Sequence, residues 1–115
     1  MESITLKGYI MTTPMEAVKQ VAPKMAEMSE LILYGDIWER PQLSKRDRSL
    51  ITIASLISMY RTGQLPGHIT RGLDNGLTRE EISEIITHMA FYAGWPASAQ
   101  ASIIASQVYN SQYDS

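Results

Sequence analysis

Cysteine is absent from the 115 residues of the chain. It therefore has no disulfide, no thiolate metal ligand and no cysteine nucleophile. Long apolar runs are missing too, since no stretch approaches the roughly 20 apolar residues that span a bilayer. The first residues also lack the cationic segment and apolar run of a secretory leader. These absences predict a soluble, cytoplasmic protein that has no thiol chemistry and no contact with a membrane.

An excess of one charge is lacking as well. Ten Lys and Arg residues and 12 Asp and Glu residues are interspersed, for a net charge of -2. Without a broad basic surface the chain is a poor candidate for nucleic-acid binding. Aliphatic residues, alanine and seven methionines supply core material, and the mix favours helices. We expect one all-α domain over residues 1–115, small enough that a second copy would help to bury its surface.

Capping signals and proline divide the chain into helices. Thr13-Pro14 resembles a helix start, and Pro23 either kinks that helix or splits it in two. Ser44 with Asp47, and Thr78 with Glu81, fit the capping-box pattern at two further starts. The expected elements are an extended lead-in over 1–13, helix over 14–34, a loop over 36–43, and helices over 44–60, 64–75, 78–93 and from 96 onward.

The helix expected over 44–60 is apolar around most of its girth between Leu50 and Ile57. A helix of this kind is buried on several sides. It therefore lies centrally in the fold or at a subunit interface.

His68 follows Pro66-Gly67 at an expected helix start. There the positive end of the helix dipole would lower the pKa of the imidazole and keep it neutral. A neutral imidazole can act as a base or as a hydrogen-bond donor. The alternative is a structural His68 bonded to a neighbouring backbone carbonyl, and the sequence leaves both open.

Three arginines, Arg40, Arg46 and Arg48, crowd the loop and first turn of the helix from 44. The helix dipole disfavours cations at this end unless an anion is near. One explanation is a site for a substrate carboxylate, which a guanidinium binds in bidentate fashion. The other, which is the more common fate, is structural ion pairing. The acids available for pairing are Asp36, Glu39 and Asp47.

A second polar and aromatic cluster, HMAFYAGWP, contains His88, Tyr92 and Trp95. His88 and Tyr92 are four residues apart and so share one helix face. Aromatic residues at a helix end more often pack in a core or an interface than line a site. The two histidines show no metal-binding spacing such as HExxH, so no metal site is expected.

Two segments of the chain resemble the carboxymuconolactone decarboxylase family, within the alkylhydroperoxidase-D-like superfamily. They are YGDIWERPQLSKRDRSLITIASL and HITRGLDNGLTREEISEIITHMAFYAGWP, and the resemblance spans about residues 22–108. It implies an all-α fold of about six helices whose subunits interlock as dimers, commonly three dimers to a hexamer.

The resemblance also implies an activity. The founding reaction of the family removes carbon dioxide from 4-carboxymuconolactone in aromatic catabolism, without a cofactor. The departing electrons pass into a conjugated lactone carbonyl, where a donor stabilises the charge, and a general acid then protonates carbon. His68 matches the family's motif histidine and is expected to be that acid, base or donor, with Arg48 as carboxylate anchor. Residues expected to line the substrate pocket are Arg46, Tyr34, Trp38, His88, Tyr92 and Trp95.

The peroxidase branch of the superfamily uses a CxxC pair, whose positions fall at Arg61 and Gln64 here, and an acid near the position of Ser49. Because the chain has no thiol, CxxC-type peroxidase activity is not expected. The leading hypothesis is a decarboxylase of 4-carboxymuconolactone or of a related small carboxylated lactone or keto acid. The alternative is a non-catalytic oligomer that binds a small ligand or serves as a scaffold.

Overall fold

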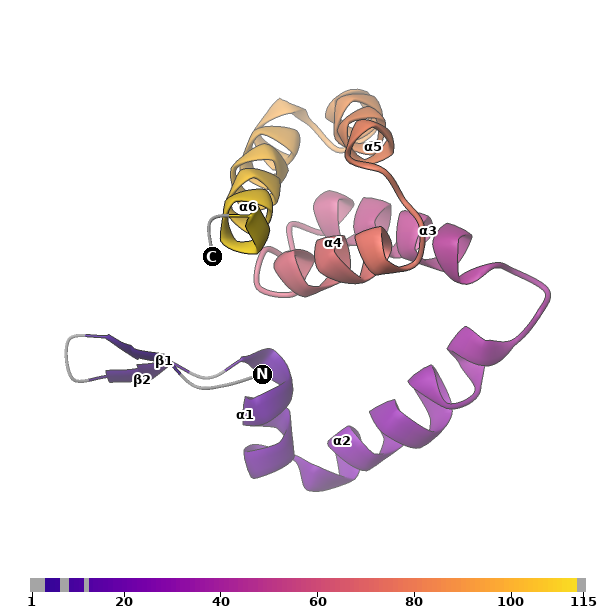
Figure 1. The fold of residues 1–115 in the computed structure, drawn as a ribbon, viewed down its shortest axis with the longest axis vertical. Helices are drawn as coiled ribbons and strands as arrows, with labels where there is room; N and C mark the ends of the chain where they lie inside the picture. Colours follow the sequence, from indigo (N-terminus) through magenta and orange to yellow (C-terminus); the bar gives the residue numbers. More distant parts are fainter. Residues whose placement is uncertain (1–3, 7–8, 12, 114–115) are drawn as a thin grey trace. The chain divides into compact units, whose positions relative to one another are not determined.

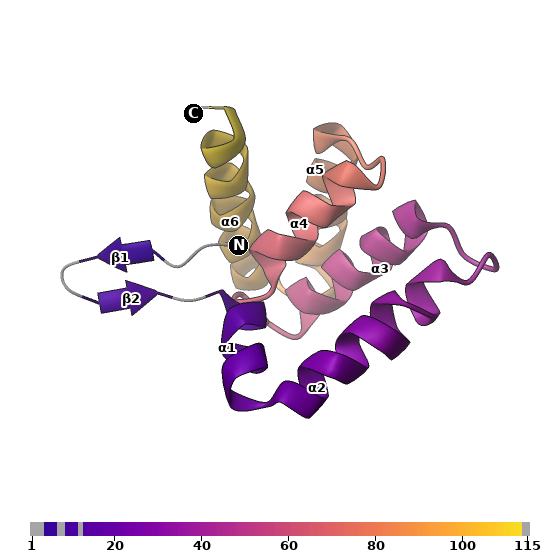
Figure 2. The same ribbon diagram turned by 60° about the horizontal axis from the view of Figure 1, so that its bottom comes forward.

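The structure is a computed structural model that describes residues 4–6, 9–11 and 13–113. The chain forms two compact units, Met1–Pro41 and Gln42–Ser115. Figures 1 and 2 show the helices of both units in two orientations. Within the described residues the fold is helical apart from one short hairpin, which confirms the all-α prediction. None of the described helices has the length and apolar character that a membrane span requires.

The first unit begins with a two-stranded antiparallel hairpin. Its strands are β1 (Ile4–Leu6) and β2 (Tyr9–Met11), and Ile4 lies opposite Met11. Residues 4–6 and 9–11 of the extended lead-in expected over 1–13 thus form two paired strands. The remaining positions of that lead-in, 1–3, 7–8 and 12, lie outside the described residues.

Two helices follow the hairpin, α1 (Pro14–Val21) and α2 (Pro23–Met28), and a π-helical segment, η1 (Ser29–Tyr34), continues the second. Thr13 caps α1, since its Oγ1 accepts from the Glu16 backbone N at 3.2 Å. Pro23 divides the helices, which decides between a kink and a split. The expected loop over 36–43 contains a short 3₁₀ turn, η2 (Ile37–Glu39), whose Trp38 is buried.

The second unit consists of four helices, α3 (Lys45–Ser58), α4 (Leu65–Asp74), α5 (Arg79–Tyr92) and α6 (Trp95–Tyr113). Both predicted caps are present. Ser44 Oγ accepts from the Asp47 backbone N at 3.0 Å, and Thr78 and Glu81 form a complete capping box. The core contains aliphatic side chains from each helix, including Ile53, Leu65, Ile69, Ile82 and Ile104.

Helix α4 packs closely on α3 because Gly72 has no side chain. A Cβ at this position would lie 3.0 Å from the Cδ1 atoms of both Ile53 and Leu77. Beside this contact, Asn75 Nδ2 donates a hydrogen bond of 3.0 Å to the hydroxyl of fully buried Ser49. The two helices are therefore joined by apolar packing and by a polar link at one end.

Only one side of α3 is fully buried within the chain. Ile53 and Ile57 lie in the core, whereas Ile51 is 54% exposed. The expected burial on several sides is therefore not met within the described single chain. The apolar side chain of Ile51 remains open to a further contact.

Helix α4 ends in a left-handed cap at Asn75-Gly76. Gly76 has φ of +107°, the Leu77 N donates to the Gly72 carbonyl at 2.9 Å, and the Gly76 N donates to Leu73 at 3.2 Å. These are the two bonds of a Schellman motif. Glycine fits this position because it adopts positive φ without a Cβ clash.

Replacing Gly76 by alanine should lower the free energy of unfolding by about 1 kcal/mol, since an L-residue is strained in the left-handed region. Urea unfolding followed by circular dichroism measures this change. Gly63→Ala is the matched control, because Gly63 has open space around it and no left-handed φ. Equal stabilities of the two variants would contradict the assignment.

Candidate functional site

His68 lies in the first turns of α4, where its backbone N donates to the Gln64 carbonyl at 3.3 Å. The ring is partly buried, and its Nδ1 atom is shielded from solvent. Burial lowers the pKa of His68 below 6.5, and the positive charge of Arg71 lowers it further. The direction of this shift agrees with the expected neutral imidazole, and its first cause is burial.

Arg48 lies in the first turn of α3. Its Nε donates to the Leu43 carbonyl at 3.2 Å, and the residue is partly buried. This bond ties the helix start to the loop before it. Part of the guanidinium therefore has a structural role.

The structure places His68 and Arg48 near opposite ends of the α3–α4 contact. Asn75 bonds to Ser49, the neighbour of Arg48, so this end of α3 lies beside the end of α4. His68 is seven residues before Asn75, a rise of about 10 Å along the helix. With this register of α4 on α3, His68 and Arg48, the two residues expected to be catalytic, do not converge within one chain.

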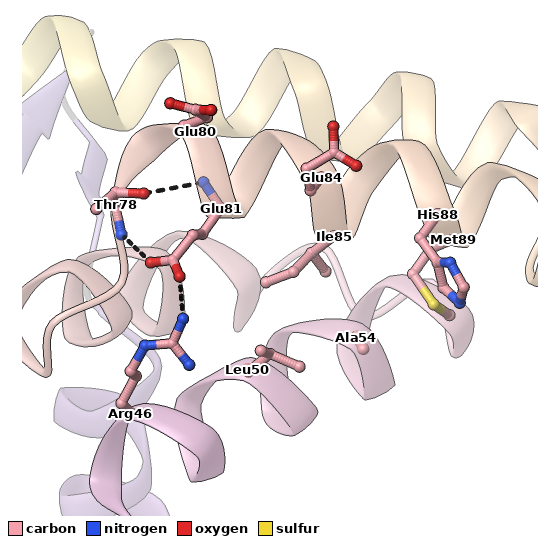
Figure 3. Close-up of a pocket in the computed structure, with 10 residues that line it drawn as sticks. All are labelled: Arg46, Leu50, Ala54, Thr78, Glu80, Glu81, Glu84, Ile85, His88 and Met89. Carbon is pink, nitrogen blue, oxygen red and sulfur yellow. Dashed lines mark hydrogen bonds and ion pairs between the residues drawn. The ribbon is translucent and has the colours of Figure 1, made fainter.

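An open groove of about 690 Å³ lies between α3 and α5 (Figure 3). Apolar side chains form its floor and charged side chains form its rim. Arg46 and His88, both predicted to bind substrate, belong to it, whereas His68 and Arg48 do not. The lining residues are Arg46, Leu50, Ala54, Thr78, Glu80, Glu81, Glu84, Ile85, His88 and Met89.

Arg46 is fixed at one end of this groove by two carboxylates. Its Nη1 bonds to Asp47 Oδ1 at 3.1 Å, and its Nη2 pairs with Glu81 Oε2. Glu81 is itself held, because its Oε1 accepts from the Thr78 backbone N at 3.0 Å (Figure 3). That backbone hydrogen bond, and then the charge of Arg46, hold the pKa of Glu81 below its usual value. For Arg46, structural ion pairing is thus the better of the two explanations.

The charges that line the groove are mostly negative. Three glutamates, Glu80, Glu81 and Glu84, line it beside a single guanidinium, that of Arg46. A small carboxylate in the groove would meet an excess of like charge. The electrostatics of this groove therefore do not favour the predicted carboxylate ligand.

The predicted aromatic residues lie in separate places. His88 stacks on Tyr92 with ring centroids 4.7 Å apart, as their four-residue spacing predicts. Tyr92 and Trp95 are 77% and 73% exposed. In the first unit, Tyr34 and Trp38 contact each other with centroids 5.7 Å apart.

Sequence reasoning missed the acidic rim of the groove. Thr78 and Glu81 were predicted as a helix cap, and that signal carries no information about Arg46, 35 positions away. The length of α5 places Glu84 and Ile85 one turn further along the same face. Among the described residues no group of three or more His, Cys, Asp or Glu side chains is arranged to hold a metal ion.

The four-helix second unit and the motif histidine define an all-α protein with a candidate acid-base site at the start of α4. The sequence profile of the Carboxymuconolactone decarboxylase family matches residues 23–107. The chain belongs to this family.

Relatives with curated names are similar to much of the chain. A 4-carboxymuconolactone decarboxylase of Acinetobacter baylyi is 41% identical over 76 residues, which cover 66% of this chain and 57% of the relative. A nitrosuccinic acid decarboxylase of Metarhizium robertsii is 32% identical over 101 residues, 85% of this chain and 71% of the relative. The matched region thus spans little more than half the length of the bacterial decarboxylase.

The lowered pKa of His68 predicts a pH dependence of stability. The unfolded chain takes up this proton near the ordinary value of 6.5, and the folded chain only at lower pH. The free energy of unfolding should therefore fall as pH drops below 6.5 and level off below the folded-state pKa.

Urea unfolding between pH 5 and 8 measures this slope. His68→Gln should reduce it, and His88→Gln, which removes the only other histidine, should leave the His68 contribution in place. A slope that is the same in the wild type and His68→Gln would show that His68 is not the titrating group.

Proposed function

We propose that this protein is a cofactor-independent carboxy-lyase that acts on 4-carboxymuconolactone or a related small carboxylic acid. The observation that carries the proposal is the partly buried histidine of the family motif, His68, whose pKa is lowered. Membership of the family and the two relatives named as decarboxylases support it. Nitrosuccinic acid, which the fungal relative's name gives as substrate, belongs to the same class of small acids.

His68 has the properties that this reaction needs. Loss of carbon dioxide leaves an electron pair that moves into a conjugated acceptor group, and a hydrogen-bond donor there lowers the barrier. Carbon is then protonated by a general acid whose pKa is matched to the working pH. A neutral imidazole supplies the donor hydrogen bond and keeps its proton, while the proton that carbon takes up comes from solvent.

Arg48 has the supporting role in this proposal. Its bond to Leu43 fixes the start of α3. In this proposal a substrate carboxylate that reaches the helix start is bound by the guanidinium of Arg48. Arg46 and His88 both line the acidic groove. We assign them to contacts at its rim that a longer substrate would make.

The active form is inferred to be a homo-oligomer built from dimers, with a hexamer as the expected size. Tyr92 and Trp95 are largely exposed, and exposed aromatic residues close together are typical of protein interfaces. A second copy that covers them would also reach Ile51 on the open side of α3. A cytoplasmic location and a place in aromatic catabolism stay predictions from the sequence.

Purified protein should release carbon dioxide from 4-carboxymuconolactone or from nitrosuccinate, and His68→Gln should lower kcat by about 100-fold or more, the usual effect of removing a donor to the charge that develops in the transition state. The assay follows substrate absorbance and carbon dioxide release for both compounds. Circular dichroism and the unfolding midpoint at pH 8 verify that the variant is folded.

Two results would contradict this proposal. Absence of turnover of both acids at high enzyme concentration would remove them as substrates and promote a ligand-binding or scaffold role. Full turnover by folded His68→Gln would remove His68 from the chemistry while leaving the reaction assigned.

A further inference from the structure

Tyr60 adopts a backbone conformation that favours glycine. Its φ is +57°, and among the described residues other than glycine it alone has positive φ. The Tyr60 N donates to the Ile57 carbonyl at 3.1 Å and the Arg61 N to the Leu56 carbonyl at 2.8 Å. These bonds form the same Schellman motif that closes α4, where the left-handed residue is Gly76.

Among the described residues, the Tyr60 side chain makes no ring contact or hydrogen bond that would offset this backbone strain. A left-handed L-residue costs about 1–2 kcal/mol, and glycine would avoid that cost. The ring is 57% exposed, and within the described part of the chain it makes no ring contact and its hydroxyl no hydrogen bond. Strained residues with no structural compensation occur preferentially at functional sites.

Arg61, the next residue, is an exposed cation without an ion pair or hydrogen bond from its guanidinium to any other described residue. From Met59 to Arg71 the chain carries two arginines and His68 but no Asp or Glu. This corner between α3 and α4 is therefore electropositive. It contrasts with the α3–α5 groove, which three glutamates line and where Glu81 pairs with Arg46.

We propose that Tyr60 and Arg61 bind the carboxylate of the substrate at the α3–α4 corner, next to the helix that carries His68. This inference rests on the proposed function and deepens it, because it moves the carboxylate anchor from Arg48, near the other end of the α3–α4 contact, to this corner beside His68. The guanidinium of Arg61 matches a carboxylate in bidentate geometry, and the hydroxyl of Tyr60 is a further donor. Both side chains are exposed at the end of α3.

The first test compares Arg61→Met, Arg61→Lys and the wild type on 4-carboxymuconolactone. Arg61→Met should raise KM about 10-fold or more, the usual effect of losing a charge-assisted hydrogen bond, with kcat changed less than about two-fold. Lysine restores charge without the bidentate fork, so Arg61→Lys should show an intermediate KM. Lys19→Met, which removes an exposed cation on α1, is the matched control and should keep the wild-type KM.

The second test replaces Tyr60. Tyr60→Gly should lower the unfolding equilibrium constant about five-fold, because the strain is removed, and should nonetheless raise KM. A purely structural tyrosine would not give this combination of higher stability and weaker binding. Tyr60→Phe keeps the ring and the strain, and it isolates the contribution of the hydroxyl to KM.

A binding measurement separates this inference from the reaction itself. Succinate, an unreactive dicarboxylate, is titrated at constant ionic strength while the melting temperature is followed. Stabilisation of the wild type and Lys19→Met, but not of Arg61→Met, would support the corner site even if no lactone is turned over. Equal stabilisation of wild type and Arg61→Met, no stabilisation of any, or an unchanged KM in Arg61→Met would overturn it.

Discussion

The close contact between α3 and α4 is the constraint on which the second unit depends. Gly72 leaves room for the side chain of Ile53, and Asn75 fixes the register by its bond to buried Ser49. Because this register is set at one end of the contact, the other end brings the start of α4 and its His68 beside the end of α3. The position of the candidate acid-base group therefore follows from packing some 10 Å away from it.

That arrangement gives the second unit two regions of different charge. On the α5 side of α3, glutamates line an open groove, and Glu81 and Asp47 hold Arg46 in ion pairs. At the α3–α4 corner the charged side chains are all basic, and burial keeps His68 neutral. Acidic residues prevail along the groove and the segment from Met59 to Arg71 has none, so electrostatics favour the second region for the carboxylate ligand proposed above.

Much of the local structure could be predicted because its causes are local. The caps at Ser44, Thr78 and Gly76 and the break at Pro23 each depend on a few neighbouring residues, and all are present. The motif histidine and its neutral state were also predicted. The pairing of Arg46 with Glu81 was not, because 35 residues separate them and only the packing of α3 on α5 brings them together.

The sequence by itself determined the helical class, the family and the identity of the motif histidine, since these depend on composition, periodicity and residues in order along the chain. Tertiary structure decided why the pKa of His68 is lowered and that Arg46 pairs with Glu81. It also revealed the strained backbone at Tyr60. The hydrogen bonds that close α3 set this φ angle, and no sequence pattern predicted a tyrosine in that conformation. Burial and ion pairing depend on residues from different helices, which come together only once the helices have packed.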